Sequence, residues 1–171
     1  VIETVIREVE IPLVLDADAL NVISEYPEIL HTRKAPTILT PHPGEMARLC
    51  SKTISEVQAD RIGAALSFSK QYGVITVLKG AYTVIATNDG RVYFNETGNS
   101  GLSRGGSGDM LTGIIGALLA QGIPAEKAAV SGVYLHGLSA DLCAQKMSQY
   151  AMLATDVIES LSDAFLQIKG R

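Results

Sequence analysis

Cysteine and tryptophan are scarce in this chain of 171 residues, which contains two cysteines and no tryptophan. Cys50 and Cys143 lie far apart in the sequence, each beside apolar residues, and this placement predicts buried free thiols in a reducing compartment. No apolar run reaches the roughly 18 residues of a membrane span, and no signal peptide is visible. These absences predict a cytoplasmic protein without a membrane partner.

Clusters of basic residues are also missing. The 14 Lys and Arg residues are outnumbered by 18 Asp and Glu residues, and the net charge is −4. This balance argues against nucleic acid or an anionic membrane surface as the main partner. The chain does not begin with methionine, and residues 1–10 have the apolar i, i+4 spacing of the end of a helix. Because 47% of the residues are hydrophobic, we expect one domain over residues 1–171. The start of the chain leads us to expect that this domain is truncated at its N-terminus.

Short apolar segments alternate with helical patterns along the chain. Strands are predicted at residues 11–15, 37–40, 74–79, 83–86 and 91–94, the last two joined by an Asp-Gly hairpin turn. Helices are predicted at residues 19–26, 45–50, 109–121, 125–143 and 156–167. A further helix to about residue 71 is expected to open on a capping box formed by Ser55 and Gln58. The alternation predicts an α/β domain with a mostly parallel sheet and helices on both faces.

The most informative segment is residues 98–109, a loop with five glycines directly before an apolar helical run. Glycines let a ligand approach the backbone closely, and the free N–H groups and dipole at a helix start favour an anion. No Lys-Ser/Thr pair follows the last glycine, and Leu111 stands where a dinucleotide fingerprint needs glycine, so neither motif fits. We expect a phosphate site. Asp109 is either a base for proton abstraction or a first-turn acid that stabilises the helix by roughly 0.3–1 kcal/mol.

Two other polar motifs follow predicted strands, where ligands of parallel sheets bind. His42, between two prolines and before Glu45, is either directed at a ligand or part of a rigid turn in which Glu45 starts a helix. Lys79, before Gly80, is either a phosphate contact or an ordinary strand-end lysine. These motifs, Asp16 and the glycine loop are expected to converge on one rim.

Other polar and small residues have a metal-binding or a packing interpretation. Asp16 and Asp18, with Glu45, are weak candidates for holding Mg²⁺ through water, while Asp18 is equally suited to start a helix. The spacing of cysteine and histidine does not favour a metal site. His136 lies in an apolar helix and is expected to be a packed residue. Gly113 and Gly116 are expected to let two helices approach closely.

Four motifs in a fixed order identify a family resemblance. They are Val14-Leu-Asp-Ala-Asp-Ala-Leu-Asn21, Thr40-Pro-His-Pro-Gly-Glu45, Leu78-Lys-Gly80, and Gly98-Asn followed by Gly105-Gly-Ser-Gly-Asp-Met-Leu-Thr-Gly113. Over nearly its whole length the chain resembles the ADP/ATP-dependent NAD(P)H-hydrate dehydratases, the carbohydrate-kinase-like domain of the YjeF family. The resemblance implies a ribokinase-like fold and a lyase that repairs the S-form of NADHX and NADPHX. It also implies ADP or ATP as phosphoryl donor, Mg²⁺, homo-oligomers that are commonly tetramers, and a possible fused or partner epimerase.

The resemblance also implies roles for individual residues. His42 and Asn99 would contact the hydrated cofactor, and Asp109 would act on its C6 hydroxyl, in the position of the kinase base. The nucleotide would be bound by Lys79, Gly80, Ala81, Tyr82, Thr83, Gly105, Gly106, Ser107 and Gly108. Ser107 departs from the family's usual threonine but keeps the hydroxyl. The alternatives are another ribokinase-like small-molecule kinase, with a stable phosphorylated product, and a non-catalytic nucleotide-binding module.

Overall fold

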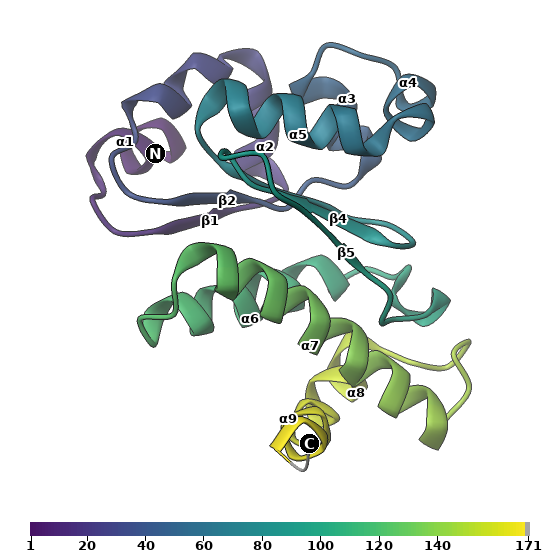
Figure 1. The fold of residues 1–171 in the computed structure, drawn as a ribbon. Coiled ribbons are helices and arrows are strands. Elements are labelled where there is room, and N and C mark those ends of the chain that lie inside the picture. The colour runs from purple at the N-terminus through teal and green to yellow at the C-terminus, as the bar shows by residue number, and fades with distance from the viewer. Residues whose placement is uncertain (170–171) are drawn as a thin grey trace.

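A computed structural model describes residues 1–169 of the chain. At its centre is a sheet of five strands in the order β1-β2-β3-β4-β5 (Figure 1). The strands are β1 (Leu13–Leu15), β2 (Thr37–Leu39), β3 (Ile75–Leu78), β4 (Thr83–Ala86) and β5 (Val92–Asn95). The first three are parallel to one another, and β4 and β5 extend the sheet in antiparallel fashion. The sheet is therefore mixed. The hairpin predicted at Asp89-Gly90 forms between β4 and β5.

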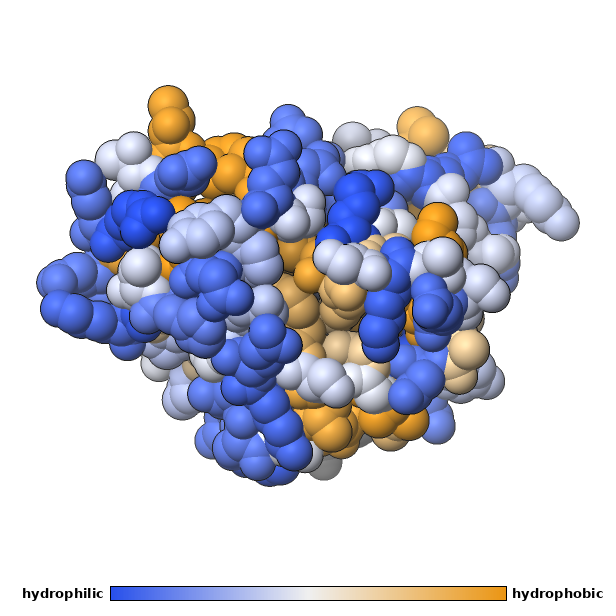
Figure 2. All heavy atoms as spheres, turned by 90° about the horizontal axis from the view of Figure 1, so that it is seen from above, coloured by the Kyte–Doolittle hydropathy of each residue, from blue (hydrophilic) through white to orange (hydrophobic). Residues whose placement is uncertain are grey.

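One face of the sheet is covered by the N-terminal helices, which form the upper layer in Figure 1. These are α1 (Ile2–Glu8), α2 (Asp18–Glu25), the 3₁₀ helix η1 (Pro27–Thr32), α3 (Pro43–Leu49), α4 (Ile54–Ala59) and α5 (Arg61–Tyr72). Seen from above, this layer presents mainly hydrophilic residues, with hydrophobic atoms visible between them (Figure 2). Leu39 and Leu78 point from the strands into the core beneath it.

The opposite face is covered by two long helices, α6 (Ser107–Ala120) and α7 (Ala125–Lys146). Ile38 and Val77, neighbours in sequence of Leu39 and Leu78, point into this second core, because successive side chains of a strand face opposite sides of the sheet. The short 3₁₀ helix η2 (Ser100–Leu102) precedes α6, and α8 (Ala154–Glu159) and α9 (Leu161–Lys169) pack against α7. The predicted α/β architecture with helices on both faces is thus confirmed. Among the described residues, no helix has the length and apolar character needed to span a membrane.

Two helix predictions were wrong in detail. The helix expected from Ser55 to residue 71 is interrupted at Asp60, and its capping box belongs to Thr53 and Glu56. The Thr53 hydroxyl accepts a hydrogen bond from the Glu56 N–H at 3.2 Å, and the Thr53 N–H donates to the Glu56 carboxylate at 2.7 Å. Asp60 starts α5 by accepting from the Gly63 N–H at 2.8 Å. Aspartate competes for backbone donors in this way and so favours caps over helix interiors. Similarly, the helix predicted at 156–167 is divided into α8 and α9.

The predicted close packing at Gly113 and Gly116 was also wrong. A Cβ atom placed at either glycine would meet nothing within 4 Å. The tight contact between α6 and α7 lies at Gly132 instead, where a Cβ would come within 2.6 Å of Ile115 Cγ1. The glycine on the partner helix makes room for a branched side chain, a relation that the sequence of α6 alone does not contain.

Candidate functional site

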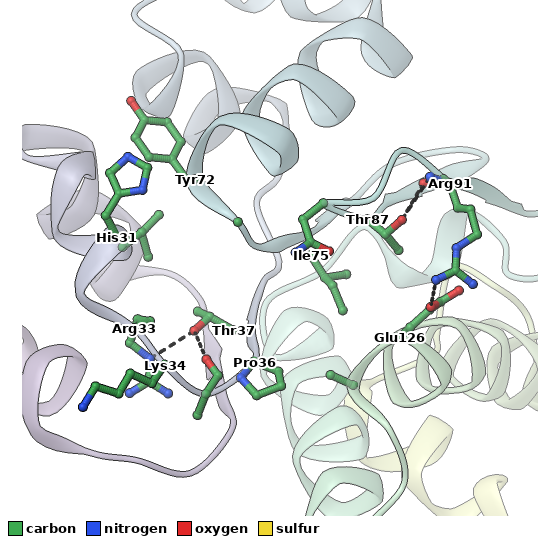
Figure 3. Close-up of a pocket in the computed structure, with 15 residues that line it drawn as sticks. His31, Arg33, Lys34, Pro36, Thr37, Tyr72, Ile75, Thr87, Arg91 and Glu126 are labelled. Carbon is green, nitrogen blue, oxygen red and sulfur yellow. Dashed lines mark hydrogen bonds and ion pairs between the residues drawn. The ribbon is translucent and has the colours of Figure 1, made fainter.

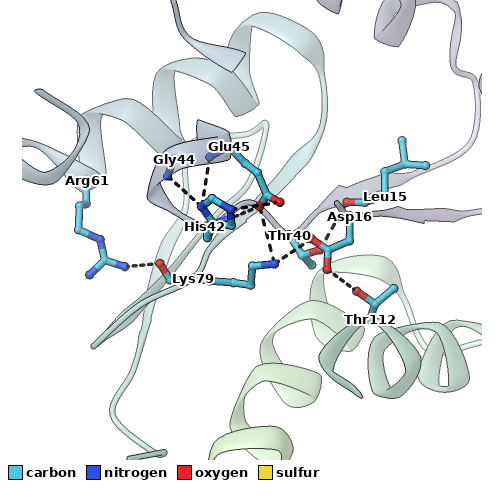
Figure 4. A network of polar contacts seen from close by, with 9 residues as sticks. All are labelled: Leu15, Asp16, Thr40, His42, Gly44, Glu45, Arg61, Lys79 and Thr112. Atoms are coloured by element: carbon cyan, nitrogen blue, oxygen red, sulfur yellow. Dashed lines mark hydrogen bonds and ion pairs between the residues drawn. The ribbon is translucent and has the colours of Figure 1, made fainter. Parts of the chain in front are cut away.

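The carboxyl ends of the three parallel strands bring Asp16, His42 and Lys79 to one rim of the sheet (Figure 4). Asp16 follows β1 directly, His42 lies between β2 and α3, and Lys79 follows β3. Parallel strands end at the same edge, so residues remote in sequence meet there. The Lys79 N–H also donates to the Pro41 carbonyl at 2.8 Å, which ties the segments after β2 and β3 together.

Lys79 forms the centre of the polar network at this rim. Its ammonium Nζ lies 2.8 Å from Asp16 Oδ1 and 3.8 Å from Glu45 Oε2. Asp16 also accepts a hydrogen bond from the Thr112 hydroxyl of α6 at 3.2 Å. The two carboxylates are mostly buried, so their attraction for Lys79 is stronger than that of a surface pair. Lys79 is therefore a shared cation that links β1, β3 and the helix after the glycine loop.

His42 is held as the N-terminal cap of α3. Its Nδ1 accepts from the N–H groups of Gly44 and Glu45, at 3.0 and 3.3 Å, while the His42 N–H donates to Glu45 Oε2 at 2.7 Å. Since Nδ1 is an acceptor, the neutral ring carries its proton on Nε2, which lies 3.4 Å from Glu45 Oε1. The turn is thus rigid and Glu45 starts the helix. About half of the His42 side chain remains exposed, so the ring is also accessible to a ligand.

The glycine loop meets the same rim at Gly108. A Cβ atom there would lie 3.3 Å from both Asp16 Oδ2 and Lys79 Nζ, so the backbone approaches the ion pair more closely than a larger residue would allow. Gly106 precedes α6 in the left-handed region, with φ at +89°. Helix α6 begins at Ser107, and Asp109 is its third residue, with an exposed side chain. The exposed carboxylate therefore lies one residue from the contact between loop and ion pair.

Asn99 has a structural role that the sequence did not predict. Its side-chain Nδ2 donates to Asp141 Oδ1 at 3.0 Å, and its Oδ1 accepts from the Gly101 N–H at 3.0 Å. Asp141 of α7 also accepts from the Gly98 N–H at 2.8 Å. Both ends of the Asn99 amide are thus used to shape the loop, and a contact to substrate stays a prediction. The presence of an acid inside the apolar helix predicted at 125–143 is a signal from which Asp141 could have been found.

The segment from Lys79 to Thr83 forms the turn between β3 and β4. Gly80 has φ at +141°, Tyr82 has φ at +53°, and the Thr83 hydroxyl donates to the Gly80 carbonyl at 3.0 Å. The guanidinium of Arg61, the first residue of α5, donates to carbonyl groups of this turn (Figure 4). Sequence reasoning missed Arg61, because it was expected inside a continuous helix.

His136 is buried beside the start of α6. Burial lowers its pKa to about 4, and the Lys79 ammonium adds to this effect, while a hydrogen bond with the Ser107 backbone opposes it. Its Nε2 atom has no hydrogen-bond partner among the described residues. The imidazole is therefore neutral at physiological pH, and it packs beneath the glycine loop as a core residue of α7.

The metal candidates do not form a ligand cluster. Asp16 and Glu45 face Lys79, and Asp18 lies in the exposed first turn of α2. Within residues 1–169, no group of three or more His, Cys, Asp or Glu side chains could hold a metal ion.

A separate pocket lies at the opposite ends of the parallel strands (Figure 3). Its volume is about 440 Å³, and Thr37 and Ile75, the first residues of β2 and β3, are in its wall. Two of the charged groups there are already engaged, since Arg91 pairs with Glu126 at 2.7 Å and Arg33 donates to Thr37 and to backbone carbonyls. None of the predicted site residues lines this cavity, so the rim remains the candidate site.

Comparisons with known proteins agree on one family. The profile of the family described as NAD(P)H-hydrate dehydratase matches residues 2–163. A bifunctional NAD(P)H-hydrate repair enzyme of Moorella thermoacetica is 44% identical over 160 residues, which are 94% of this chain and 30% of that protein. An ADP-dependent (S)-NAD(P)H-hydrate dehydratase of Neisseria meningitidis is 50% identical over 133 residues, 77% of this chain and 45% of that protein. The chain thus spans less than half the length of these relatives.

A solved structure gives the same result for the fold. The ADP/ATP-dependent NAD(P)H-hydrate dehydratase of Bacillus subtilis, co-crystallised with ATP and Mg²⁺, superposes with a TM-score of 0.83. Its sequence is 38% identical, and the match covers 91% of this chain and 55% of that one. The ribokinase-like fold expected from the sequence motifs is thereby confirmed.

Proposed function

Because this chain belongs to the NAD(P)H-hydrate dehydratase family, we propose that it takes part in the ADP- or ATP-dependent dehydration of the S-form of NADHX and NADPHX. The products would be NADH and NADPH, so the protein would repair damaged nicotinamide cofactors. The observation that carries the proposal is the meeting of the glycine loop with the Asp16–Lys79 pair at Gly108. A helix start suited to an anion, an exposed carboxylate and a partly buried cation come together at this rim.

The chemistry follows from the poor leaving ability of hydroxide. Asp109 would accept the proton of the C6 hydroxyl as its oxygen attacks the terminal phosphoryl group of the donor. An O–P bond forms at the hydroxyl while the donor's own P–O bond breaks. Phosphate then departs from C6 with the bonding electrons, a proton is lost from C5, and the ring double bond is restored. In this proposal the C6 hydroxyl is phosphorylated before the elimination, because phosphate leaves far more readily than hydroxide.

The remaining site residues would bind and orient the two substrates. The N–H groups of residues 105–108 at the start of α6 would stabilise charge on the transferred phosphoryl group, and residues 79–83 would bind the nucleotide. His42, with its exposed ring, would contact the hydrated cofactor. When bound with the donor, Mg²⁺ would neutralise charge on the phosphates, and Asp16, Asp18 and Glu45 could reach it only through water.

We also propose partners, an assembly and a location for the protein. The relative from Moorella thermoacetica is named bifunctional, which supports an epimerase fused to this unit or acting beside it. A homo-oligomer and a cytoplasmic location are proposed on the same family grounds. The thiols of Cys50 and Cys143 are both unpaired, consistent with a reducing compartment.

The decisive experiment measures absorbance of the reduced nicotinamide when the purified protein is given NADHX and Mg²⁺ with ADP, with ATP or with no nucleotide. Absorbance should recover only with a nucleotide, and mass spectrometry should find free phosphate and no phosphorylated cofactor. A stable phosphorylated product would identify a small-molecule kinase instead. Nucleotide binding without any conversion would identify a non-catalytic module.

Asp109→Asn tests the proposed base directly. Loss of general-base catalysis should lower kcat by about 10²–10⁴-fold, while the affinity for ADP stays close to that of the wild type. Asp163→Asn is the matched control, because Asp163 is also a first-turn acid but lies in α9 and pairs with Lys146. Near-normal turnover of Asp109→Asn would remove Asp109 from the mechanism.

A further inference from the structure

Arg61 binds three carbonyl groups around the turn between β3 and β4. Its Nη2 donates to the Leu78 carbonyl at 3.0 Å and to the Lys79 carbonyl at 3.3 Å, and its Nη1 donates to the Ala81 carbonyl. A Cβ atom at Gly80 would lie only 2.9 Å from Arg61 Nη2, so the guanidinium lies directly against this glycine. The break between α4 and α5 at Asp60 places Arg61 at the helix start that faces the turn.

The captured carbonyls fix the direction of the neighbouring N–H groups. In a planar trans peptide, the C=O of one residue and the N–H of the next point in opposite directions. Since the Lys79 and Ala81 carbonyls point toward Arg61, the N–H groups of Gly80 and Tyr82 point away from it. No backbone hydrogen bond recorded for residues 1–169 has either group as donor. Both residues are exposed, so these donors are open to a ligand.

The charge of Arg61 favours an anion on the open side of the turn. Among the described residues, no carboxylate lies within ion-pair distance of its guanidinium. Burial lowers the pKa of Arg61, yet the group remains protonated because arginine titrates far above neutral pH. Its Nε atom is buried without a partner. A positive charge behind aligned peptide dipoles, with two free N–H groups in front, is a typical anion-binding arrangement.

We propose that Arg61 is a positioning residue, which holds the N–H groups of Gly80 and Tyr82 as donors to phosphate oxygens of the bound nucleoside diphosphate. The inference rests on the proposed function, since it assumes that residues 79–83 bind the nucleotide. It adds that recognition there depends on backbone donors and on a side chain from α5. The Lys79 ammonium, in contrast, faces Asp16 and Glu45.

Arg33 provides a matched control for a purely structural role. It also pins backbone carbonyls, those of Ile6, Val9 and Ile11, but it does so in the wall of the cavity at the opposite end of the strands. Arg61→Met and Arg33→Met should both lower the melting temperature. Only Arg61→Met should raise the Kd for ADP, by roughly tenfold or more, because two hydrogen bonds to a charged acceptor lose their alignment.

Arg61→Lys separates positioning from charge, because lysine keeps the positive charge but cannot present the planar fork that reaches three carbonyls. Its Kd for ADP should stay well above that of the wild type. Full affinity in Arg61→Lys, or equal Kd values in Arg61→Met and Arg33→Met, would overturn the inference while leaving the proposed function intact. A wild-type protein that fails to bind ADP would overturn both.

Amide resonances of the wild type supply an independent readout. On addition of ADP, the N–H signals of Gly80 and Tyr82 should shift strongly, and these shifts should be lost in Arg61→Met and kept in Arg33→Met. ADP binding that leaves both signals unmoved would show that the turn does not donate to the nucleotide, and the inference would be wrong.

Discussion

At the scale of single residues, groups at the rim that we propose to bind ligands also hold the local structure together. His42 caps α3 through Nδ1 while half of its side chain stays exposed. Lys79 is held by two carboxylates at the point where Gly108 approaches it. Asn99, predicted to contact substrate, uses both ends of its amide inside the loop. Substitution of such residues changes the shape of the rim as well as its contacts, so each needs a stability measurement beside the activity assay.

His136 gives a prediction for pH at this scale. Its pKa is lowered from 6.5 to about 4, so the unfolded chain binds a proton more readily than the folded one. The neutral ring makes its full contribution to the free energy of unfolding above pH 6.5, and this contribution is lost as the pH falls toward 4. This amounts to about 3 kcal/mol of the free energy of unfolding.

Urea unfolding of the wild type and of His136→Gln between pH 7 and pH 4 measures this effect. The variant should lose about 3 kcal/mol less than the wild type over that range, because glutamine does not titrate. Parallel curves for the two proteins would assign the acid sensitivity to another group.

At the scale of elements, the contact between α6 and α7 includes a tight approach at Gly132. Gly132→Ala would bring a Cβ to 2.6 Å from Ile115 Cγ1, and such overpacking typically costs about 1–3 kcal/mol. Gly116→Ala is the matched control, since a Cβ there meets nothing within 4 Å and alanine is favoured over glycine within a helix by up to about 1 kcal/mol. Urea unfolding should show opposite signs for the two variants, and stabilisation by Gly132→Ala would contradict the packing described.

The positions of helix boundaries show what local sequence predicts at this scale. The hairpin at Asp89-Gly90 and the long helices α6 and α7 were predicted from residues adjacent in sequence. The interruption at Asp60 was missed because its side chain caps α5 in the middle of the expected helix, and the capping box of α4 is formed by Thr53 and Glu56 in place of the expected Ser55 and Gln58. Both pairs have suitable chemistry, so the residue types alone did not identify the pair that forms the box.

At the scale of the whole molecule, ligand binding should raise the free energy of unfolding and the melting temperature. If ADP binds the folded state alone, a concentration of 100 times its Kd adds about 2.7 kcal/mol, which raises the melting temperature by roughly 5–10 °C in a domain of this size. Lys34→Met in the wall of the cavity at the opposite end of the strands should leave this shift unchanged. Thermal unfolding with and without ADP provides the test, and a shift abolished by Lys34→Met would place the nucleotide in that cavity.

The sequence by itself determined the α/β class, the hairpin, the glycine loop before α6 and the family, because strands, turns and helix starts depend on neighbouring residues. It also indicated that Asp16, His42 and Lys79 share a rim, since parallel strands end at one edge. Only the tertiary structure decided which groups touch there. Asp16 and Lys79 are 63 positions apart, Asn99 and Asp141 are 42 apart, and Arg61 reaches a carbonyl 20 positions away. Such contacts arise when separate elements pack against each other, and no local pattern encodes them.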